Sequence, residues 1–238
     1  MKILYFLKIL LKGNKAANTI KMDSNSKIKK SNNVLIKNCK ISLINSTINL
    51  SDSTILSNVN ITLINANLDV GIKSRFEGVD NIRPEIYIND GNLSVGICSR
   101  IKSAITIRFK GICTIGDYNT INEGTEIRCD EKITIGSFNM ISYNCQINDT
   151  NTHNILSISE RRNQSIKEFP FMGGEYTRPP SKPVVIGDDC WLGKGVTILK
   201  GVEIGNASVV GTQAVVTKNI PNCSLAVGNP AIIVKSYE

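Results

Sequence analysis

An aliphatic residue recurs at every sixth position in the C-terminal part of the chain. The positions are Ile186, Leu192, Ile198, Ile204, Val210 and Val216. Glycine directly follows four of these six positions, and the residue four places after each aliphatic is mostly small or β-branched. Six consecutive matches at one fixed spacing predict a repeat architecture.

Each six-residue unit predicts a short strand followed by a bend, and three units close one triangular coil. The aliphatic side chain points inward, where its copies from successive coils stack into a continuous apolar column. The glycine either avoids a clash at the tight corner or supplies a left-handed backbone dihedral angle. The pattern therefore predicts an all-β fold, a left-handed parallel β-helix of six-residue repeats.

A second register of the same pattern runs from residue 95 to residue 147. Gly96, Gly116 and Gly136 follow aliphatic residues and open three coils at a spacing of twenty, so each coil carries two extra residues at one corner. Together with the repeats above, this register defines a repeat domain over 95–238.

Upstream of this domain the pattern is weaker but still present. Ile41, Ile48, Ile55 and the stretch 59–68 are aliphatic and stand among Asn, Ser and Thr residues. We interpret residues 21–94 as degenerate coils of the same β-helix.

The periodicity fails between the last coil of the second register and Ile186. Residues 148–185 are polar, charged and rich in glycine and proline. A long loop inside a regular solenoid is typically functional. His153, the only histidine of the chain, lies near the start of this inserted loop.

The first twelve residues are mostly apolar, with lysines at helical spacing in and just after them. This run is too short to span a bilayer, and no convincing signal-peptide cleavage site follows it. We expect a short N-terminal helix within residues 1–20. It either lies in a membrane interface, as a peripheral contact through residues 1–12, or packs on the body of the protein.

Cysteine usage and net charge indicate which cellular compartment and which binding partners to expect. Seven cysteines, with no Cys-x-x-Cys spacing, argue against a disulfide framework and against a zinc site, and favour reduced thiols in the cytoplasm. The net charge of +8 suggests an anionic partner. Lys and Arg are spread thinly and are not interleaved with aromatic residues, so we expect no nucleic acid. A phosphate-bearing cofactor, a nucleotide-linked sugar or a membrane surface fits better.

Four segments carry a family resemblance, which is best over 135–235. They are Lys182-Pro-Val-Val-Ile-Gly-Asp-Asp-Cys-Trp-Leu-Gly193, Gly201-Val-Glu-Ile-Gly205, Val216-Thr-Lys-Asn-Ile-Pro221 and Gly228-Asn-Pro-Ala231. The chain resembles hexapeptide-repeat acetyltransferases, above all the galactoside and maltose O-acetyltransferases and their relatives that modify bacterial surface polysaccharides. The resemblance implies a homotrimer, acetyl-CoA as the donor, and a catalytic histidine leading into the inserted loop.

That histidine is His153, in the segment Asn148-Asp-Thr-Asn-Thr-His153. A sugar hydroxyl needs a base to remove its proton as it attacks a thioester, and imidazole, which titrates near neutral pH, suits this task. Either Asp149 or Asn151 orients the ring, or both are turn residues that cap backbone amides. A single histidine excludes the γ-class carbonic anhydrases of the same fold, which hold zinc with several histidines, so no metal is expected.

The resemblance also implies positions for the cofactor and the acceptor. The residues matching cofactor contacts are Lys194, Thr212, Thr217, Lys218 and Lys235, with Lys218 meeting phosphate and Thr212 offering its backbone amide to the pantetheine arm. Ile232 departs from the basic residue usual in the family. Trp191, the only tryptophan, either walls the cofactor cleft or packs in the trimer interface.

The acceptor position departs from the galactoside enzymes. Gly124 replaces their acceptor-binding asparagine, flanked by Asn122 and Glu123, which we take as the candidate acceptor contacts. An acceptor other than a simple galactoside is therefore expected.

Three functions remain open at this point. The first is transfer of acetyl from acetyl-CoA to a hydroxyl of a bacterial surface glycan, such as capsule or lipopolysaccharide, or its precursor. This would take place in the cytoplasm or at the inner face of the cell membrane. The second is N-acetylation of a nucleotide-linked amino sugar. The third is a non-catalytic β-helix scaffold, which would not need the loop, His153 and Lys218 together.

Overall fold

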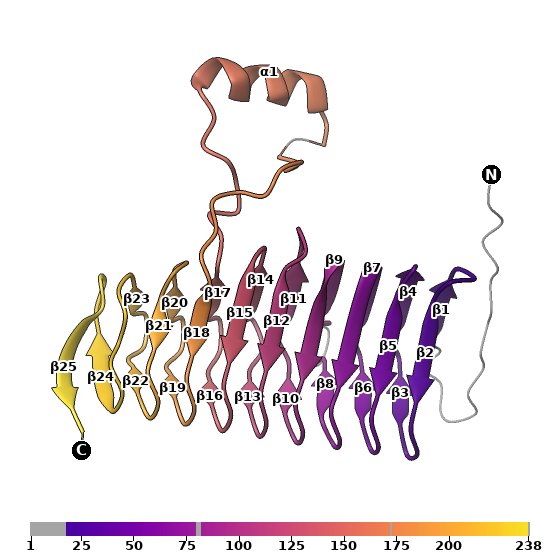
Figure 1. Cartoon of the computed structure of the whole chain (residues 1–238), viewed down its shortest axis with the longest axis horizontal. Helices are drawn as coiled ribbons and strands as arrows, with labels where there is room; N and C mark the ends of the chain where they lie inside the picture. The colour runs from indigo at the N-terminus through magenta and orange to yellow at the C-terminus, as the bar shows by residue number, and fades with distance from the viewer. Residues whose placement is uncertain (1–17, 80–81, 172, 238) are drawn as a thin grey trace.

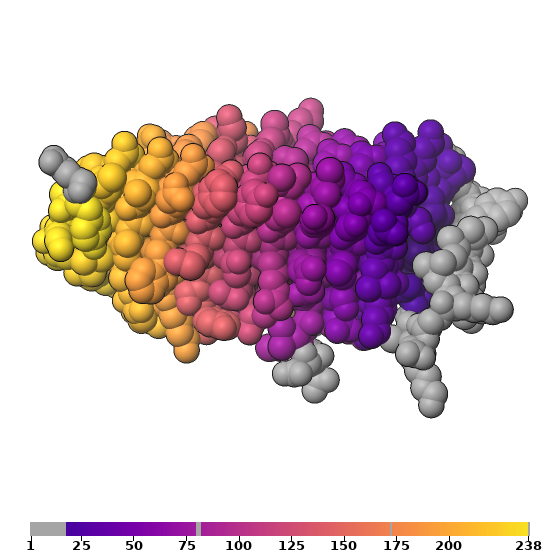
Figure 2. All heavy atoms as spheres, turned by 90° about the horizontal axis from the view of Figure 1, so that it is seen from below, coloured from indigo at the N-terminus to yellow at the C-terminus, as the bar shows by residue number. Residues whose placement is uncertain are grey.

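Parallel pairing of strands from successive coils builds an elongated solenoid (Figure 1). This computed structural model describes residues 18–79, 82–171 and 173–237. Figure 2 shows the body as a rod along which the chain advances steadily from the N-terminal coils to the C-terminal coils. Each coil contributes strands to three faces, which we name in chain order the first, second and third face.

The first face begins each coil and is continuous from the N-terminal end to the C-terminal coils. Its strands are β1 (Thr19–Met22), β4 (Lys40–Ile44), the first half of β7 (Asn60–Val70), the first half of β9 (Glu85–Val95), β11 (Ala104–Ile107), β14 (Glu126–Cys129), β17 (Gln146–Asn148), β20 (Thr197–Ile198) and β23 (Val215–Val216).

The second face follows after one corner, and the long strands β7 and β9 bend around that corner to serve both faces. Its remaining strands are β2 (Lys27–Lys30), β5 (Thr47–Leu50), β12 (Ile112–Ile115), β15 (Lys132–Ile135), β18 (Val184–Ile186) and β21 (Glu203–Ile204).

The third face closes each coil. Its strands are β3 (Leu35–Lys37), β6 (Ile55–Ser57), β8 (Arg75–Glu77), β10 (Arg100–Ile101), β13 (Thr120–Ile121), β16 (Met140–Ile141), β19 (Trp191–Leu192), β22 (Val209–Val210) and β24 (Ser224–Val227). The last strand, β25 (Ile232–Ser236), returns antiparallel on β24 and covers its outer edge. A terminal element of this kind protects a solenoid from pairing end to end.

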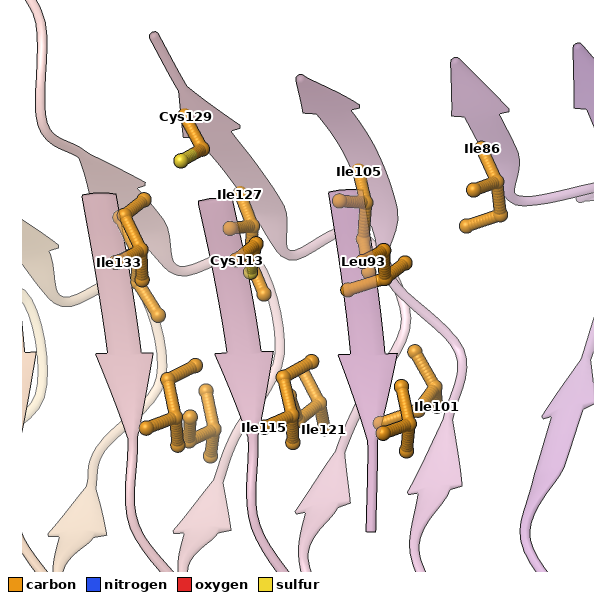
Figure 3. Close-up of a cluster of buried hydrophobic side chains, with 14 of the residues drawn as sticks. Ile86, Leu93, Ile101, Ile105, Cys113, Ile115, Ile121, Ile127, Cys129 and Ile133 are labelled. Atoms are coloured by element: carbon orange, nitrogen blue, oxygen red, sulfur yellow. The ribbon is translucent and has the colours of Figure 1, made fainter. Parts of the chain in front are cut away.

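Alternation of inward and outward side chains along the strands fills the interior with aliphatic residues. All six aliphatic positions from 186 to 216 are buried, as are Val95, Ile115 and Ile135, the aliphatic residues that precede the three glycines of the second register. Side chains of successive coils repeat at the same level, as Leu93, Cys113 and Ile133 do in Figure 3. The predicted all-β parallel solenoid with one long insertion is confirmed.

The register of the N-terminal coils differs at one predicted position. Ile41 and Ile48 point inward as expected, but Ile55 faces outward and its neighbour Leu56 occupies the core. Leu56 pairs in register with the buried Phe76 of the next coil. Because side chains alternate along a strand, a shift of one residue exchanges the inner and outer face.

Steric clash explains the corner glycines of the second register. A Cβ on Gly116 would lie 2.7 Å from the carbonyl oxygen of Gly136 in the next coil. The left-handed dihedral angles of these corners instead belong to non-glycine residues two positions later, such as Tyr118 (φ 55°) and Phe138 (φ 62°), whose rings stack with centroids 5.0 Å apart.

The predicted N-terminal helix falls largely on residues outside the described part of the chain. Residues 1–17, which include the proposed membrane contact through 1–12, are not among the described residues, and Thr19 and Ile20 already belong to strand β1. Among the described residues, no helix combines the length and the apolar character needed to cross a membrane.

Cysteines serve as core fillers in this solenoid. Cys113 and Cys129 are fully buried on adjacent coils, and burial raises the pKa of the Cys113 thiol to about 12. A thiol with so high a pKa stays protonated at neutral pH and behaves as a small apolar side chain.

Truncation of one interior aliphatic residue should destabilise the solenoid strongly. Ile121 is fully buried between Ile101 and Ile141 of the neighbouring coils. We expect Ile121→Ala to lower the free energy of unfolding by about 2–5 kcal/mol, because the cavity cannot collapse between paired coils. Thr120→Ala on the same strand faces outward and should change it by less than about 0.5 kcal/mol. Denaturant unfolding at fixed protein concentration compares the two, and equal losses would contradict the stacked-core account.

Candidate active site

The inserted loop leaves the solenoid at the corner between the first and second faces, after β17. Its two ends are joined: Thr150 and Ser181 form an antiparallel bridge, and the backbone N–H of Lys182 donates to the Asp149 carbonyl oxygen at 2.8 Å. The backbone N–H of Asn151 donates to the carbonyl oxygen of Pro180 at 3.0 Å. These contacts hold the base of the loop and so place His153 at a defined point just above the corner.

Asp149 anchors this base and does not orient the histidine ring. Its carboxylate is fully buried and accepts the backbone N–H groups of Asp130 at 2.8 Å and Glu131 at 2.9 Å. Burial raises the pKa of Asp149, although these backbone hydrogen bonds act in the opposite direction. The expectation that Asp149 orients His153 is therefore corrected, because both carboxylate oxygens are engaged at the preceding corner. Asn151 is exposed, and its backbone N–H is the group that the loop base uses.

Glu175, which no pattern in the sequence indicated, contacts the ring of His153. The distance between His153 Nδ1 and Glu175 Oε1 is 2.9 Å, and the His153 side chain remains 59% exposed. A carboxylate at Nδ1 favours the tautomer whose proton lies on that nitrogen, which leaves Nε2 as the free acceptor. The two residues lie 22 positions apart, on opposite sides of the loop helix.

Asn154 holds Glu175 in place. Its side-chain amide donates to Glu175 Oε2 at 2.7 Å, and its backbone N–H donates to Oε1 at 3.2 Å. Burial alone raises the pKa of Glu175, but the hydrogen bonds from Asn154 and His153 outweigh it and lower that pKa below its ordinary value. These contacts therefore stabilise the loop above the carboxyl's unfolded pKa, and that stability is lost as the pH falls through the lowered pKa of the folded state.

A helix that the sequence analysis did not predict fills the middle of the loop. It is α1 (Ile158–Glu168), which stands away from the solenoid in Figure 1 and buries none of its residues. Ser157 and Glu160 form a reciprocal capping box at its start. The signal was present in the sequence, because Ser-x-x-Glu at this spacing is a recognised start of a helix.

The predicted acceptor residues lie away from His153. Asn122 and Glu123 form the corner that precedes β14, whereas His153 follows the other end of the neighbouring strand β17. Glu123 pairs with Lys102 at 3.2 Å, and the Asn122 amide donates to the carbonyl oxygen of Ile141. The structure thus separates these two residues from the ring by the width of the first face.

The predicted cofactor residues fall on two corners of the same face. Lys194 and Thr212 lie on adjacent coils at the corner where the third face meets the first. Thr217 and Lys218 follow β23 at the corner that also carries the loop. All four are exposed, so each is accessible to a ligand from outside the coil.

Trp191 and Lys235 complete the predicted set. Trp191 faces outward from β19 beside Met140 of the preceding coil, and 52% of its surface is exposed. Lys235 lies on β25, where its Nζ is 5.1 Å from the centroid of the Tyr237 ring. Within residues 18–79, 82–171 and 173–237, no group of three or more His, Cys, Asp or Glu side chains is arranged to hold a metal ion.

Comparison with known proteins agrees with this architecture. Residues 183–218 match the family described as bacterial transferase hexapeptide (six repeats). The putative lipopolysaccharide biosynthesis O-acetyl transferase WbbJ of Escherichia coli K12 is 34% identical over 161 residues, which cover 66% of this chain and 78% of WbbJ. The chain belongs to the hexapeptide-repeat acetyltransferase family.

Two further relatives were found. The putative colanic acid biosynthesis acetyltransferase WcaF of E. coli K12 is 28% identical over 57% of this chain and 64% of its own length. The crystal structure of the polySia-specific acetyltransferase NeuO superposes with a TM-score of 0.51 over 90% of this chain and 88% of NeuO, at 20% identity. At that identity the match to NeuO establishes the fold.

Removal of the charge on Glu175 should lower turnover. Glu175→Gln keeps the size of the side chain but removes the negative charge that would stabilise a positively charged ring while it holds the proton. Glu175→Ala, which also loses the orienting contact, should lower turnover by on the order of 10²-fold.

Glu160→Gln on α1 is the matched control for the charge change in the same loop. It should leave turnover unchanged, because Glu160 contacts Ser157 and not the ring. Turnover of Glu175→Gln equal to that of the unaltered protein would show that Glu175 does not act on His153.

Proposed function

We propose that this chain is an acetyl-CoA-dependent O-acetyltransferase that acetylates a hydroxyl of a bacterial surface glycan, such as capsule or lipopolysaccharide, or its precursor. The observation that carries the proposal is the pairing of the single histidine with a half-buried carboxylate of the inserted loop. The separation of 2.9 Å between His153 Nδ1 and Glu175 Oε1 leaves Nε2 directed to other partners. The names of WbbJ and WcaF, which describe O-acetyl transfer and acetyl transfer in polysaccharide synthesis, support the choice of reaction.

In this mechanism His153 is the general base. Its Nε2 accepts the proton of the acceptor hydroxyl while the hydroxyl oxygen attacks the thioester carbon. The tetrahedral intermediate then collapses, the carbon–sulfur bond breaks, and the imidazolium returns the proton to the departing CoA thiolate. Glu175 stabilises the imidazolium between these two steps without itself taking the proton.

The donor site of this proposal uses exposed residues of the C-terminal coils. Lys218 at the loop corner supplies positive charge for a CoA phosphate, and Lys235 supplies a second positive charge on the last strand. Thr212 offers a backbone amide to the pantetheine arm, and Lys194 lies at the same corner of the preceding coil. Trp191 forms an outer wall close to Lys194.

Two features support a homotrimer. The cofactor residues lie on two corners of one chain, and a neighbouring copy that places its loop corner against the corner of Lys194 and Thr212 would bring both sets around one ligand. The loop also exposes apolar side chains, with Ile155 90% exposed and Phe171 86% exposed. A segment with so much exposed apolar surface gains stability by packing on another copy.

A homotrimer should be the stable form in solution. Sedimentation equilibrium at micromolar concentration is expected to give three times the chain mass of 26.0 kDa. A double variant, Ile155→Ser with Phe171→Ser, removes apolar loop surface and should weaken association without unfolding the coils. A stable monomer of the unaltered protein would contradict both the trimer and the shared cofactor cleft.

Loss of His153 should abolish turnover without loss of the donor site. A positioned general base contributes on the order of 10²–10⁴-fold in rate, so we expect His153→Ala to lower turnover by about that factor. Calorimetry should show nearly unchanged CoA binding, because the proposed donor contacts lie from Lys194 to Lys235. Lys218→Ala is the matched control and should weaken CoA binding while it leaves the base intact. If His153→Ala keeps more than about a tenth of the turnover, the role is wrong and N-acetylation of an amino sugar becomes the better reading.

A further inference from the structure

Two neighbouring grooves lie on the outer surface of the first face, in the N-terminal half of the solenoid. One has a volume of about 450 Å³ and is lined by residues of β1, β4, β7 and β9. The other has a volume of about 330 Å³ and is lined by residues of β9, β11 and β14. Glu85 lines both, so the two grooves adjoin and follow the long axis of the rod.

The register of the coils aligns the lining side chains in two columns. The first column is Thr19, Lys40, Asn60, Glu85, Ala104, Glu126 and Gln146, and the second is Lys21, Ser42, Thr62, Tyr87, Thr106, Arg128 and Asn148. Parallel strands lie about 4.8 Å apart, so the six steps from β1 to β17 cover roughly 29 Å. Figure 1 shows these strands side by side, ending where the loop leaves the body.

The columns combine small polar side chains with charged ones, including Glu85 where the two grooves meet. Ser42, Thr62 and Thr106 offer hydroxyl groups in the middle of the surface, while lysines stand at the N-terminal end and Arg128 at the other. Two atoms of this surface, Asn60 Oδ1 and Arg128 Nε, are buried and have no hydrogen-bond partner among the described residues. Buried polar atoms are normally paired, so these two unpaired atoms are exceptions on this surface.

The second face of the same coils is different. There the outward side chains bond to one another along the rod, from Asn49 to Asp69 at 2.5 Å and from Asn67 to Asn92 at 2.9 Å. Ser94 continues this ladder to Thr114 at 3.4 Å. This face also carries a groove, of about 250 Å³, but its lining is confined to β2, β5 and the turns after them, whereas the two grooves of the first face adjoin and reach β14.

The C-terminal end of the groove lies beneath the candidate active site. Arg128 pairs in register with Asn148, the last residue before the loop anchor Asp149. A chain lying in the groove would therefore reach the histidine by following the coils.

The side chains of the groove indicate which class of ligand fits it. Backbone groups of the first face are used between coils, so an added peptide strand has no edge to pair with and recognition must come from side chains. Mixed charge, with Glu85 and Glu126 among the basic residues, disfavours a nucleic-acid backbone. Hydroxyl, amide and charged groups beside one tyrosine suit a hydroxyl-rich chain, and solenoids use extended surfaces of this kind for elongated ligands.

We infer that this groove binds the extended chain of a glycan acceptor and leads it to His153, so that the N-terminal coils form a polysaccharide-binding tract. The inference rests on the proposed O-acetyltransferase function and specifies its acceptor as a polymer several sugars long. It also gives a role to coils that lie before the family match at residues 183–218.

The experiment fills the groove and leaves the neighbouring face as a control. Thr62→Trp places an indole in the centre of the groove, and Thr106→Trp does the same nearer the loop. Thr114→Trp is the matched control, because Thr114 is an equally half-buried threonine that faces outward from the second face. Each full-length variant is applied to an array of bacterial capsule and O-chain polysaccharides, with circular dichroism and sedimentation to verify folding and assembly.

We expect the unaltered protein and Thr114→Trp to bind the same polysaccharides, and at least one of the two groove variants to bind them tenfold less tightly or worse. The groove variants should bind acetyl-CoA normally. If the unaltered protein binds no polysaccharide on the array, or if all three variants bind equally, the inference is overturned. Loss of the assembly in the folded Thr62→Trp variant would overturn it too, by showing that a second copy covers the groove.

The proposed function is tested separately in the same samples. Polysaccharide binding without acetyl transfer would retain the groove and contradict the O-acetyltransferase proposal. Acetyl transfer to a small sugar without polysaccharide binding would retain the enzyme and contradict the groove.

Discussion

Burial of aliphatic side chains between successive coils is the constraint on which the rest of this structure depends. A single coil has no core of its own, because its inward residues contact mainly the coils before and after it. The backbone groups of each coil are likewise satisfied by its neighbours. Stability is therefore distributed along the rod, and every coil must keep the same cross-section, which is why Leu93, Cys113 and Ile133 can follow one another in one row.

A uniform interior leaves function to the corners and the outer faces. The long insertion occurs at a corner where preceding coils already accommodate two extra residues, so the coils on either side pair without interruption. Asp149 shows how the break is tolerated: its buried carboxylate caps two backbone N–H groups of the previous corner, and the loop rises from that fixed point. The solenoid thus supplies a rigid base, and the loop supplies the chemistry.

The proposed active site combines residues of the inserted loop with residues of the regular coils, and different features of the fold determine their positions. His153 and Glu175 meet because the loop base is closed and α1 directs the chain back toward the corner. The proposed donor residues belong to regular coils, where position follows from register, and the proposed acceptor groove belongs to coils farther toward the N-terminus. The loop residues, the proposed donor residues and the proposed acceptor groove follow one another along the axis of the solenoid. This arrangement suits the transfer of a small group to a long chain.

The sequence by itself determined the architecture, because a six-residue aliphatic period is a local property that any coil must satisfy. It also located the loop and its histidine, since both interrupt that period. Only the tertiary structure decided that Leu56 and not Ile55 enters the core, because neighbouring apolar residues fit either face until a partner strand selects one. The contact between His153 and Glu175 was likewise beyond the sequence, because residues 22 positions apart in an aperiodic loop meet only once the loop has closed.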